Sequence, residues 1–131
     1  MPSILMLGRF LPKLHSIRDS ILELSTANIY CHKWVDFEPD IIIPLAKDKN
    51  AQIVIVDLSS YLQNVNKLLD NLQHNALSQM KIVVIHFYEG SVLNALRSRF
   101  PQMHFLSIKE VDTQLLPIIL SLSNTVSLSY R

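Results

Sequence analysis

Residues 51–60 read AQIVIVDLSS, and this stretch decides the expected fold. Four β-branched residues, Ile53 to Val56, follow one another and end at Asp57, after which small polar residues begin. A continuous apolar run of this length is typical of a strand covered on both faces, as in a parallel sheet between two layers of helices. In such folds, ligands bind beyond the carboxyl ends of the strands. Asp57 is therefore the first candidate for a functional residue.

Four other segments have the character of strands. Two of them, 3–7 (SILML) and 81–87 (KIVVIHF), are also continuous apolar runs. The other two, 28–34 (NIYCHKW) and 103–108 (MHFLSI), carry more polar residues and are expected at the edges of the sheet. Helices are expected between and after the strands. The first three are expected over 11–24, within 39–49 with Pro44 near the first turn, and from Ser60 through Leu62 to Leu72. The fourth is expected from Gly90 to Pro101, with Val92, Leu93 and Leu96 inward, and the last from Asp112 or Thr113 nearly to Arg131.

Five alternating strand–helix units favour a three-layer α/β/α sandwich with right-handed crossovers. Dry strands belong in the middle of the sheet and the more polar ones at its edges. This gives a five-stranded parallel sheet of order 2-1-3-4-5, which is one of the common doubly wound orders. At 131 residues, the chain fits a single domain over residues 1–131.

The composition excludes several classes of function. The chain has 12 Lys+Arg against 11 Asp+Glu, and it has no basic run of the kind that binds nucleic acid. Cys31 is the only cysteine, so no internal disulfide is possible and a reducing cytoplasm is expected. No signal peptide is visible, and the most apolar region, 115–128, is too short and too rich in serine to span a bilayer. Two glycines in the whole chain argue against a glycine-rich phosphate loop.

The arrangement resembles, along the whole chain, the receiver domain of two-component response regulators. In that family, two acidic residues after the first strand bind Mg²⁺, and an aspartate at the end of the third strand accepts a phosphoryl group. A serine or threonine ends the fourth strand, and a lysine followed by a proline ends the fifth. The resemblance implies that Asp57 matches the phosphoacceptor and that Lys109 falls near the family's lysine, although Glu110 replaces the proline.

The rest of the pocket departs from the family's pattern. Gly8 and Arg9 stand where the acidic pair is expected, and His86 stands where the hydroxyl residue is expected. Phosphoryl transfer needs a metal ion, and Mg²⁺ needs several oxygen ligands, whereas a guanidinium repels the ion and suits a carboxylate. We therefore predict a degenerate receiver (a pseudo-receiver) without metal or cofactor, in which a salt bridge from Arg9 to Asp57 closes the pocket.

Each of these residues also has a simpler interpretation. Asp57 can end a strand and cap the following turn, Arg9 can be a solvated surface residue, and His86 can be a partly buried histidine bonded to backbone. The five histidines lack metal-ligand spacing, which argues against zinc, and Cys31 is expected to act as a small apolar residue. A triad of Ser59, His86 and Asp57 can be assembled on paper, but no nucleophile elbow supports it.

The last helix is a candidate protein interface, because no charged residue occurs between Thr113 and Tyr130. A helix on the outside of a sandwich normally has one apolar and one charged face. The sheet-facing stripe is expected to consist of Val111, Leu115, Ile118, Ile119, Leu122 and Val126. Three leucines remain for an interface, namely Leu116, Leu120 and Leu128. Alternatively, the serines of this helix make a sufficiently polar outer face.

We therefore expect a non-enzymatic signalling module: a phosphorylation-independent receiver-like domain that mediates dimerisation or controls an output domain, which would be one that regulates transcription. Such domains stand at the amino end of bacterial transcription regulators, and the chain is a candidate piece of one. The expected partner is a second copy or a following output domain, with no direct contact to nucleic acid or membrane. The alternatives are an atypical phosphoacceptor using Asp57 and Lys109, and a flavodoxin-like binder of a flavin or another small molecule. The low glycine count argues against the flavodoxin-like binder.

Overall fold

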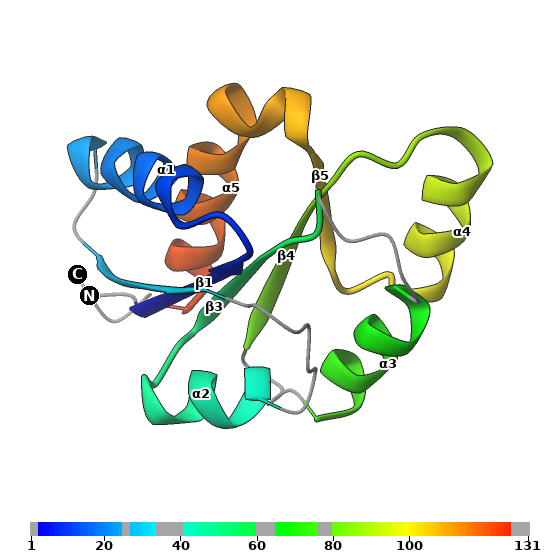
Figure 1. Ribbon diagram of the computed structural model, residues 1–131, viewed down its shortest axis with the longest axis horizontal. Coiled ribbons are helices and arrows are strands. Elements are labelled where there is room, and N and C mark those ends of the chain that lie inside the picture. Colours follow the sequence, from blue (N-terminus) through cyan, green and yellow to red (C-terminus); the bar gives the residue numbers. More distant parts are fainter. Residues whose placement is uncertain (1–2, 25–26, 34–40, 60–64, 76–79, 127–131) are drawn as a thin grey trace.

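The computed structural model of the protein describes residues 3–24, 27–33, 41–59, 65–75 and 80–126. Strands and helices alternate along this part of the chain (Figure 1). The strands are β1 (Ser3–Gly8), β2 (Asn28–Lys33), β3 (Ile53–Asp57), β4 (Lys81–His86) and β5 (His104–Ser107). The helices are α1 (Leu11–Leu24), α2 (Ile42–Asp48), α3 (Val65–Asn75), α4 (Gly90–Arg99), the short 3-10 helix η2 (Ile108–Glu110) and α5 (Val111–Val126).

The five strands form one parallel sheet in the order β2-β1-β3-β4-β5. Helices α1 and α5 cover one face of the sheet, and α2, α3 and α4 cover the other. The predicted three-layer α/β/α sandwich and the predicted strand order are both confirmed. The fold is therefore the receiver- or flavodoxin-like one.

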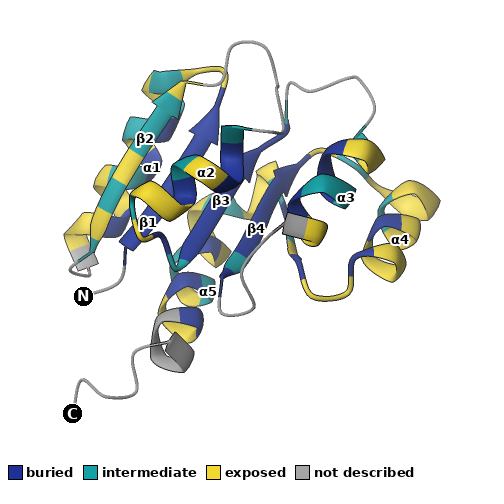
Figure 2. Cartoon of the chain, turned by 90° about the horizontal axis from the view of Figure 1, so that it is seen from below, coloured by how far each residue is buried: buried dark blue, intermediate teal, exposed yellow. Residues whose placement is uncertain are grey.

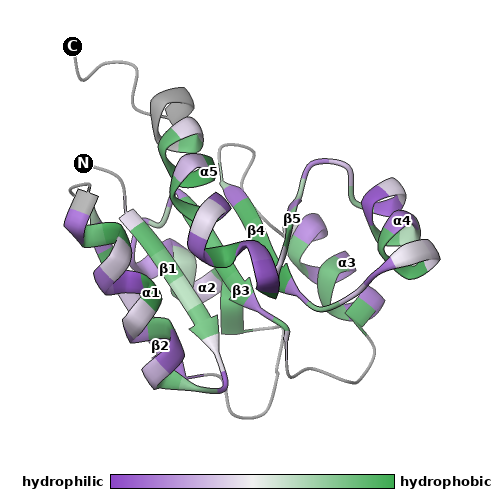
Figure 3. Ribbon diagram, turned by 90° about the horizontal axis from the view of Figure 1, so that it is seen from above, coloured by the Kyte–Doolittle hydropathy of each residue, from purple (hydrophilic) through white to green (hydrophobic). Residues whose placement is uncertain are grey.

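Two hydrophobic cores flank the sheet, and the central strands contribute to both. In β3, Ile53 and Ile55 face the core under α1 and α5, whereas Val54 and Val56 face the core under α2, α3 and α4. Full burial of such a side chain contributes about 1.5–3 kcal/mol, which is why β1, β3 and β4 are continuously apolar. Figure 2 shows these strands as buried and β2 as a mixture, and Figure 3 shows β1, β3 and β4 as mostly hydrophobic.

The structure tests the predictions for the helices on the α2–α4 face only in part. Helix α2 begins at Ile42, with Pro44 in its first turn as expected, and the expected start near residue 39 lies outside the described residues. Helix α3 buries Leu68, Leu69 and Leu72 as predicted, whereas Ser60 and Leu62 lie outside the described residues.

In α4, the predicted inward position of Val92 is wrong. Leu96 is buried, but Val92 is 54% exposed, because only the last turn of α4 and the following Phe100 reach the core. The α4 arginines, Arg97 and Arg99, are exposed as predicted.

Helix α5 begins one residue earlier than expected because η2 leads directly into it. A capping box stabilises the start of η2: Ser107 Oγ accepts from the N–H of Lys109, and the Glu110 carboxylate accepts from the N–H of Ser107. None of the helices in the described ranges, α5 included, is long and apolar enough to cross a membrane.

Candidate functional site

Asp57 ends β3 at the carboxyl edge of the sheet and is only 5% exposed. Its side chain continues the row of Ile53 and Ile55 and therefore faces α1. The N–H of Ser59, two residues further on, donates to Asp57 Oδ1 at 3.0 Å. This is the local turn that short acidic residues form at the end of a strand. The capping role considered for Asp57 is therefore present.

The second oxygen of Asp57 carries an ion pair with Lys13. Lys13 Nζ lies 2.9 Å from Asp57 Oδ2 and also donates to Ser59 Oγ at 2.8 Å. Lys13 lies in the first turn of α1, where a cation is unfavourably placed with respect to the helix dipole. The contact with a buried carboxylate offsets this cost. Lys13, Asp57 and Ser59 thus form one closed network at the carboxyl edge, which we call the Lys13–Asp57 clamp.

The predicted cation at Asp57 was Arg9, and the ion pair that the structure shows at Asp57 is with Lys13. Arg9 lies just beyond the end of β1, in a bend, and is exposed. Lys13 reaches the carboxylate because the first turn of α1 passes over the end of β3.

Gly8 lies beside Asp57, at the end of β1. A Cβ atom added at Gly8 would lie 3.2 Å from Asp57 Cβ and 3.2 Å from a methyl carbon of Leu14. Such contacts are tighter than ordinary packing allows, so a side chain at position 8 would force its neighbours to move. At the position where the receiver family has its first acidic residue, a side chain would therefore require Asp57 or Leu14 to shift by a few tenths of an ångström.

Lys109 and His86, the other two predicted pocket residues, make their contacts elsewhere. Lys109 Nζ lies 3.5 Å from Glu89 Oε1, and both side chains are about four-fifths exposed, at 80% and 77%. An ion pair this exposed contributes little to stability. Asp57 is in register with Ile85, so His86 points to the opposite face of the sheet from Asp57.

The ring of His86 is fully buried between aromatic side chains. It stacks on Tyr88, with ring centroids 5.7 Å apart, and meets the edge of Phe105 at 6.0 Å. The N–H of Tyr88 donates to His86 Nδ1 at 3.0 Å, whereas Nε2 has no hydrogen-bond partner in the described part of the chain. Burial, together with the positive charge of Arg97, lowers the pKa of His86 below its ordinary value. The backbone-bonded histidine considered from the sequence is the one observed.

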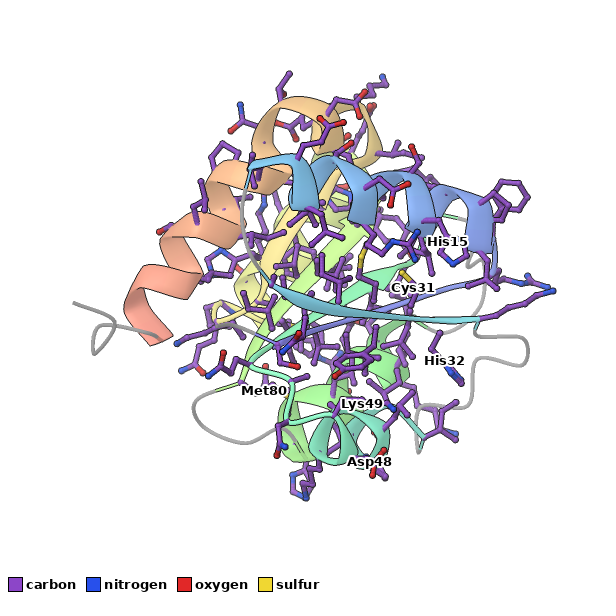
Figure 4. All side chains as sticks on the ribbon, turned by 90° about the vertical axis from the view of Figure 1, so that its left-hand side faces the viewer. His15, Cys31, His32, Asp48, Lys49 and Met80 are labelled. Carbon is purple, nitrogen blue, oxygen red and sulfur yellow. The ribbon has the colours of Figure 1, made fainter. Side chains whose placement is uncertain are left out.

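The remaining candidates do not form a metal or catalytic site in the described residues. Within those ranges, no three His, Cys, Asp or Glu side chains lie close enough together to hold a metal ion. Figure 4 shows Cys31 pointing from β2 toward α1, whereas His32 points to the other side. Burial raises the pKa of the Cys31 thiol, which keeps it in the unreactive form. The Ser59–His86–Asp57 triad is not assembled, because His86 lies on the other face of the sheet.

Lys13 is the functional residue that sequence reasoning missed. The available signal was its position in the first turn of the first helix, because this turn starts at the carboxyl edge in any doubly wound sheet. A lysine at that end of a helix, next to an expected buried aspartate, was a candidate partner. Only the orientation of α1 over β3 distinguishes it from Arg9.

Comparisons with known proteins identify structures with the same fold. No protein-family model matches the chain, and no curated protein matches it. The RcsB response regulator of Salmonella typhimurium superposes with a TM-score of 0.75 at 14% identity, over 95% of this chain and 60% of RcsB. The receiver domain of RcsB from Escherichia coli gives a TM-score of 0.73 at 13% identity, over 95% of this chain and 94% of that domain.

A third similar structure is a protein from Burkholderia pseudomallei described as pilus-assembly-related. Its TM-score is 0.76 at 10% identity, and the match covers 97% of this chain and 92% of that one. This chain thus spans three fifths of the RcsB chain and almost all of the separate receiver domain. Sequence identities this low establish the fold alone. The chain has the fold of response-regulator receiver domains.

Proposed function

We propose that the chain is a non-enzymatic, cytoplasmic regulatory module: a phosphorylation-independent receiver-like (pseudo-receiver) domain that acts through protein contacts. The observation that carries this proposal is the ammonium group of Lys13, 2.9 Å from the carboxylate that would accept a phosphoryl group. The fold supports the comparison with receiver domains, and the Lys13–Asp57 clamp supports the independence from phosphorylation.

Phosphoryl transfer to Asp57 would require a divalent cation next to its carboxylate. In this chain, Lys13 already neutralises the carboxylate and Ser59 N–H occupies the other oxygen. Gly8 supplies no oxygen ligand from its side chain, and a side chain there would crowd Asp57 and Leu14. Lys109, which would have to contact the transferred phosphoryl group, pairs with Glu89 instead. The domain is therefore held in one state, with its charge balanced internally.

The direct test is incubation with acetyl phosphate and Mg²⁺, or with beryllofluoride and Mg²⁺. We expect the intact mass and the amide spectrum of the chain to remain unchanged, because the clamp excludes the cation. The Asp57→Asn variant is the matched control, and a receiver domain with a complete acidic pair shows that the reagents are active. Stoichiometric labelling that disappears in Asp57→Asn would refute the proposal and establish the atypical phosphoacceptor.

The proposed contact surface is the outer face of α5, through which the domain binds a second copy or a following output domain. Leu120 is 41% exposed there. Leu116 is half-buried, because part of its side chain packs against the core under α1 and α5. It is therefore less exposed than the prediction assumed. Leu128, the third predicted interface residue, lies outside the described residues. Leu116 and Leu120 are one turn apart in a stretch without charged residues, and contiguous apolar surface favours protein contact.

Light scattering on the purified chain tests the homodimer. If the partner is a second copy, the chain should be a dimer at about 100 μM, with about 800 Å² buried per partner, and Leu120→Glu should be a monomer because a buried carboxylate opposes association. Leu22→Glu is the matched control, since Leu22 is a leucine of α1 with a similar exposed fraction, 44%. A wild-type chain that stays monomeric at this concentration would rule out the homodimer.

A further inference from the structure

A groove of about 360 Å³ lies between α1 and α5, on the face of the sheet opposite to α2, α3 and α4. Its floor is formed by core side chains of both helices, Ile17 and Ile21 from α1 and Leu115 from α5. The wall on the α5 side is Leu116, which is half-buried. Leu120, one turn further along α5, extends this apolar wall outward, because residues four apart lie on the same side of a helix.

The rims of the groove are polar and acidic. Glu23 lines it from α1 and Asp112 from α5, and the hydroxyl-bearing Ser16 and Ser20 of α1 also line it. Both carboxylates are on exposed residues, and neither takes part in an ion pair among the residues that the structure describes. No lysine or arginine lines the groove. A chain with almost balanced charge thus has a locally acidic groove with an apolar wall.

We infer that this groove binds a basic amphipathic helix of a partner protein or output domain. An apolar side chain of the partner would lie against Leu116 and Leu120, and lysine or arginine side chains would pair with Glu23 and Asp112. Helices commonly bind in grooves between helices through such a row of apolar side chains. The inference rests on the proposed function, because it names the kind of partner that the α5 surface binds.

Charge decides against a second copy of the chain as the occupant. A two-fold symmetric contact would place the groove of one copy against the groove of the other. Glu23 and Asp112 of the two copies would then face one another, and like charges across an interface are strongly unfavourable. A cationic partner instead neutralises both rims, so the complementary occupant is basic.

The test uses two synthetic peptides, each designed as a helix of alanine with leucines four residues apart. One carries lysines beside the leucines and the other carries glutamates at the same positions. We expect the lysine peptide to bind the full chain in a calorimetric titration at low salt, with amide shifts confined to α1 and α5. We expect the glutamate peptide not to bind. Raising the ionic strength should weaken binding, since the rim charges are exposed.

Variants of the groove make the test specific. Combining Glu23→Gln with Asp112→Asn should weaken binding of the lysine peptide about tenfold, the effect of losing two exposed ion pairs. Asp48→Asn is the matched control, because Asp48 is an exposed aspartate of α2, on the other side of the molecule from α1 (Figure 4). Reversing the rims with Glu23→Lys and Asp112→Lys should transfer binding to the glutamate peptide.

Two outcomes would overturn the inference. One is that the lysine peptide does not bind at millimolar concentration, and the other is that Asp48→Asn weakens binding as much as the groove variants do. These results are independent of the phosphorylation test. A labelled Asp57 with intact peptide binding would refute the proposed independence from phosphorylation, whereas an unlabelled chain without peptide binding would refute the groove alone.

Discussion

Replacing Lys13 with methionine should lower the free energy of unfolding by about 2–3 kcal/mol, because the change leaves the carboxylate of Asp57 buried without its counter-ion. Methionine retains most of the aliphatic chain of lysine, so the loss reports the charge and not the packing. Asp57 is 6% exposed at its side chain and Lys13 is 26% exposed. The pair is thus partly screened, and the expected loss lies below that of a fully buried pair. Urea unfolding followed by circular dichroism measures it.

A double-mutant cycle separates the clamp from other effects of the same change. Lys13→Met combined with Asp57→Asn should cost clearly less than the sum of the two single variants, since the second change removes the unpaired charge. Lys47→Met, at an exposed lysine of α2, is the control and should change stability by less than about 0.5 kcal/mol. Additive losses, or equal losses at Lys13 and Lys47, would show that the ion pair contributes nothing to the fold.

The Lys13→Met variant also tests what keeps divalent cations away from Asp57. If the ammonium group excludes them, millimolar Mg²⁺ should raise the melting temperature of the variant and leave that of the wild type unchanged. The expected increase is small, because Asp57 supplies one carboxylate where Mg²⁺ prefers several oxygen ligands.

Acid should destabilise the protein through His86, with the loss occurring below the ordinary pKa of histidine. The buried ring is held neutral, since the N–H of Tyr88 donates to Nδ1 and a protonated Nδ1 would place two donors against each other. Burial and Arg97 lower the pKa of His86 in the folded protein. A group with a lowered pKa in the folded state binds protons more readily when unfolded. Its contribution is therefore complete above the unfolded pKa of about 6.5 and is lost as the pH falls through the folded pKa.

His86→Phe should flatten this pH dependence, because phenylalanine keeps the ring between Tyr88 and Phe105 and cannot bind a proton. At neutral pH the variant should be less stable by about 1–2 kcal/mol, since the N–H of Tyr88 loses its acceptor. His104, an exposed histidine whose pKa is lowered by partial burial and by Lys81, is the control. His104→Gln should keep most of the pH dependence. Parallel pH profiles for wild type and His86→Phe would contradict the prediction.

The fold could be predicted because burial on both faces of a strand is a local property of the sequence. The apolar runs in β1, β3 and β4 identify the central strands, and the polar residues of β2 and β5 identify the edges. Once the inner and outer strands are distinguished, the crossover rules leave few strand orders. Val92 was misplaced because helical periodicity does not reveal where the sheet ends beneath α4.

The functional site could be predicted only in part. The sequence by itself determined that Asp57 ends a central strand at the carboxyl edge, and that residues 8 and 9 lack the carboxylates of a receiver pocket. It could not determine which cation contacts Asp57, because Arg9 and Lys13 are only four residues apart and both follow the first strand. In the tertiary structure, the first turn of α1 lies over the end of β3, and Lys13 therefore makes the ion pair with Asp57.

The position of His86 and the groove between α1 and α5 also depend on how the elements pack. Ile85 is in register with Asp57, and His86, the next residue of β4, therefore points to the other face of the sheet. The acidic rims, Glu23 and Asp112, are 89 residues apart in a chain whose local pattern says nothing about their proximity. Hydrophobic periodicity fixes which side of an element is buried, whereas contacts between elements depend on how those elements pack, to within a fraction of a side chain's length. Those contacts were decided by the tertiary structure alone.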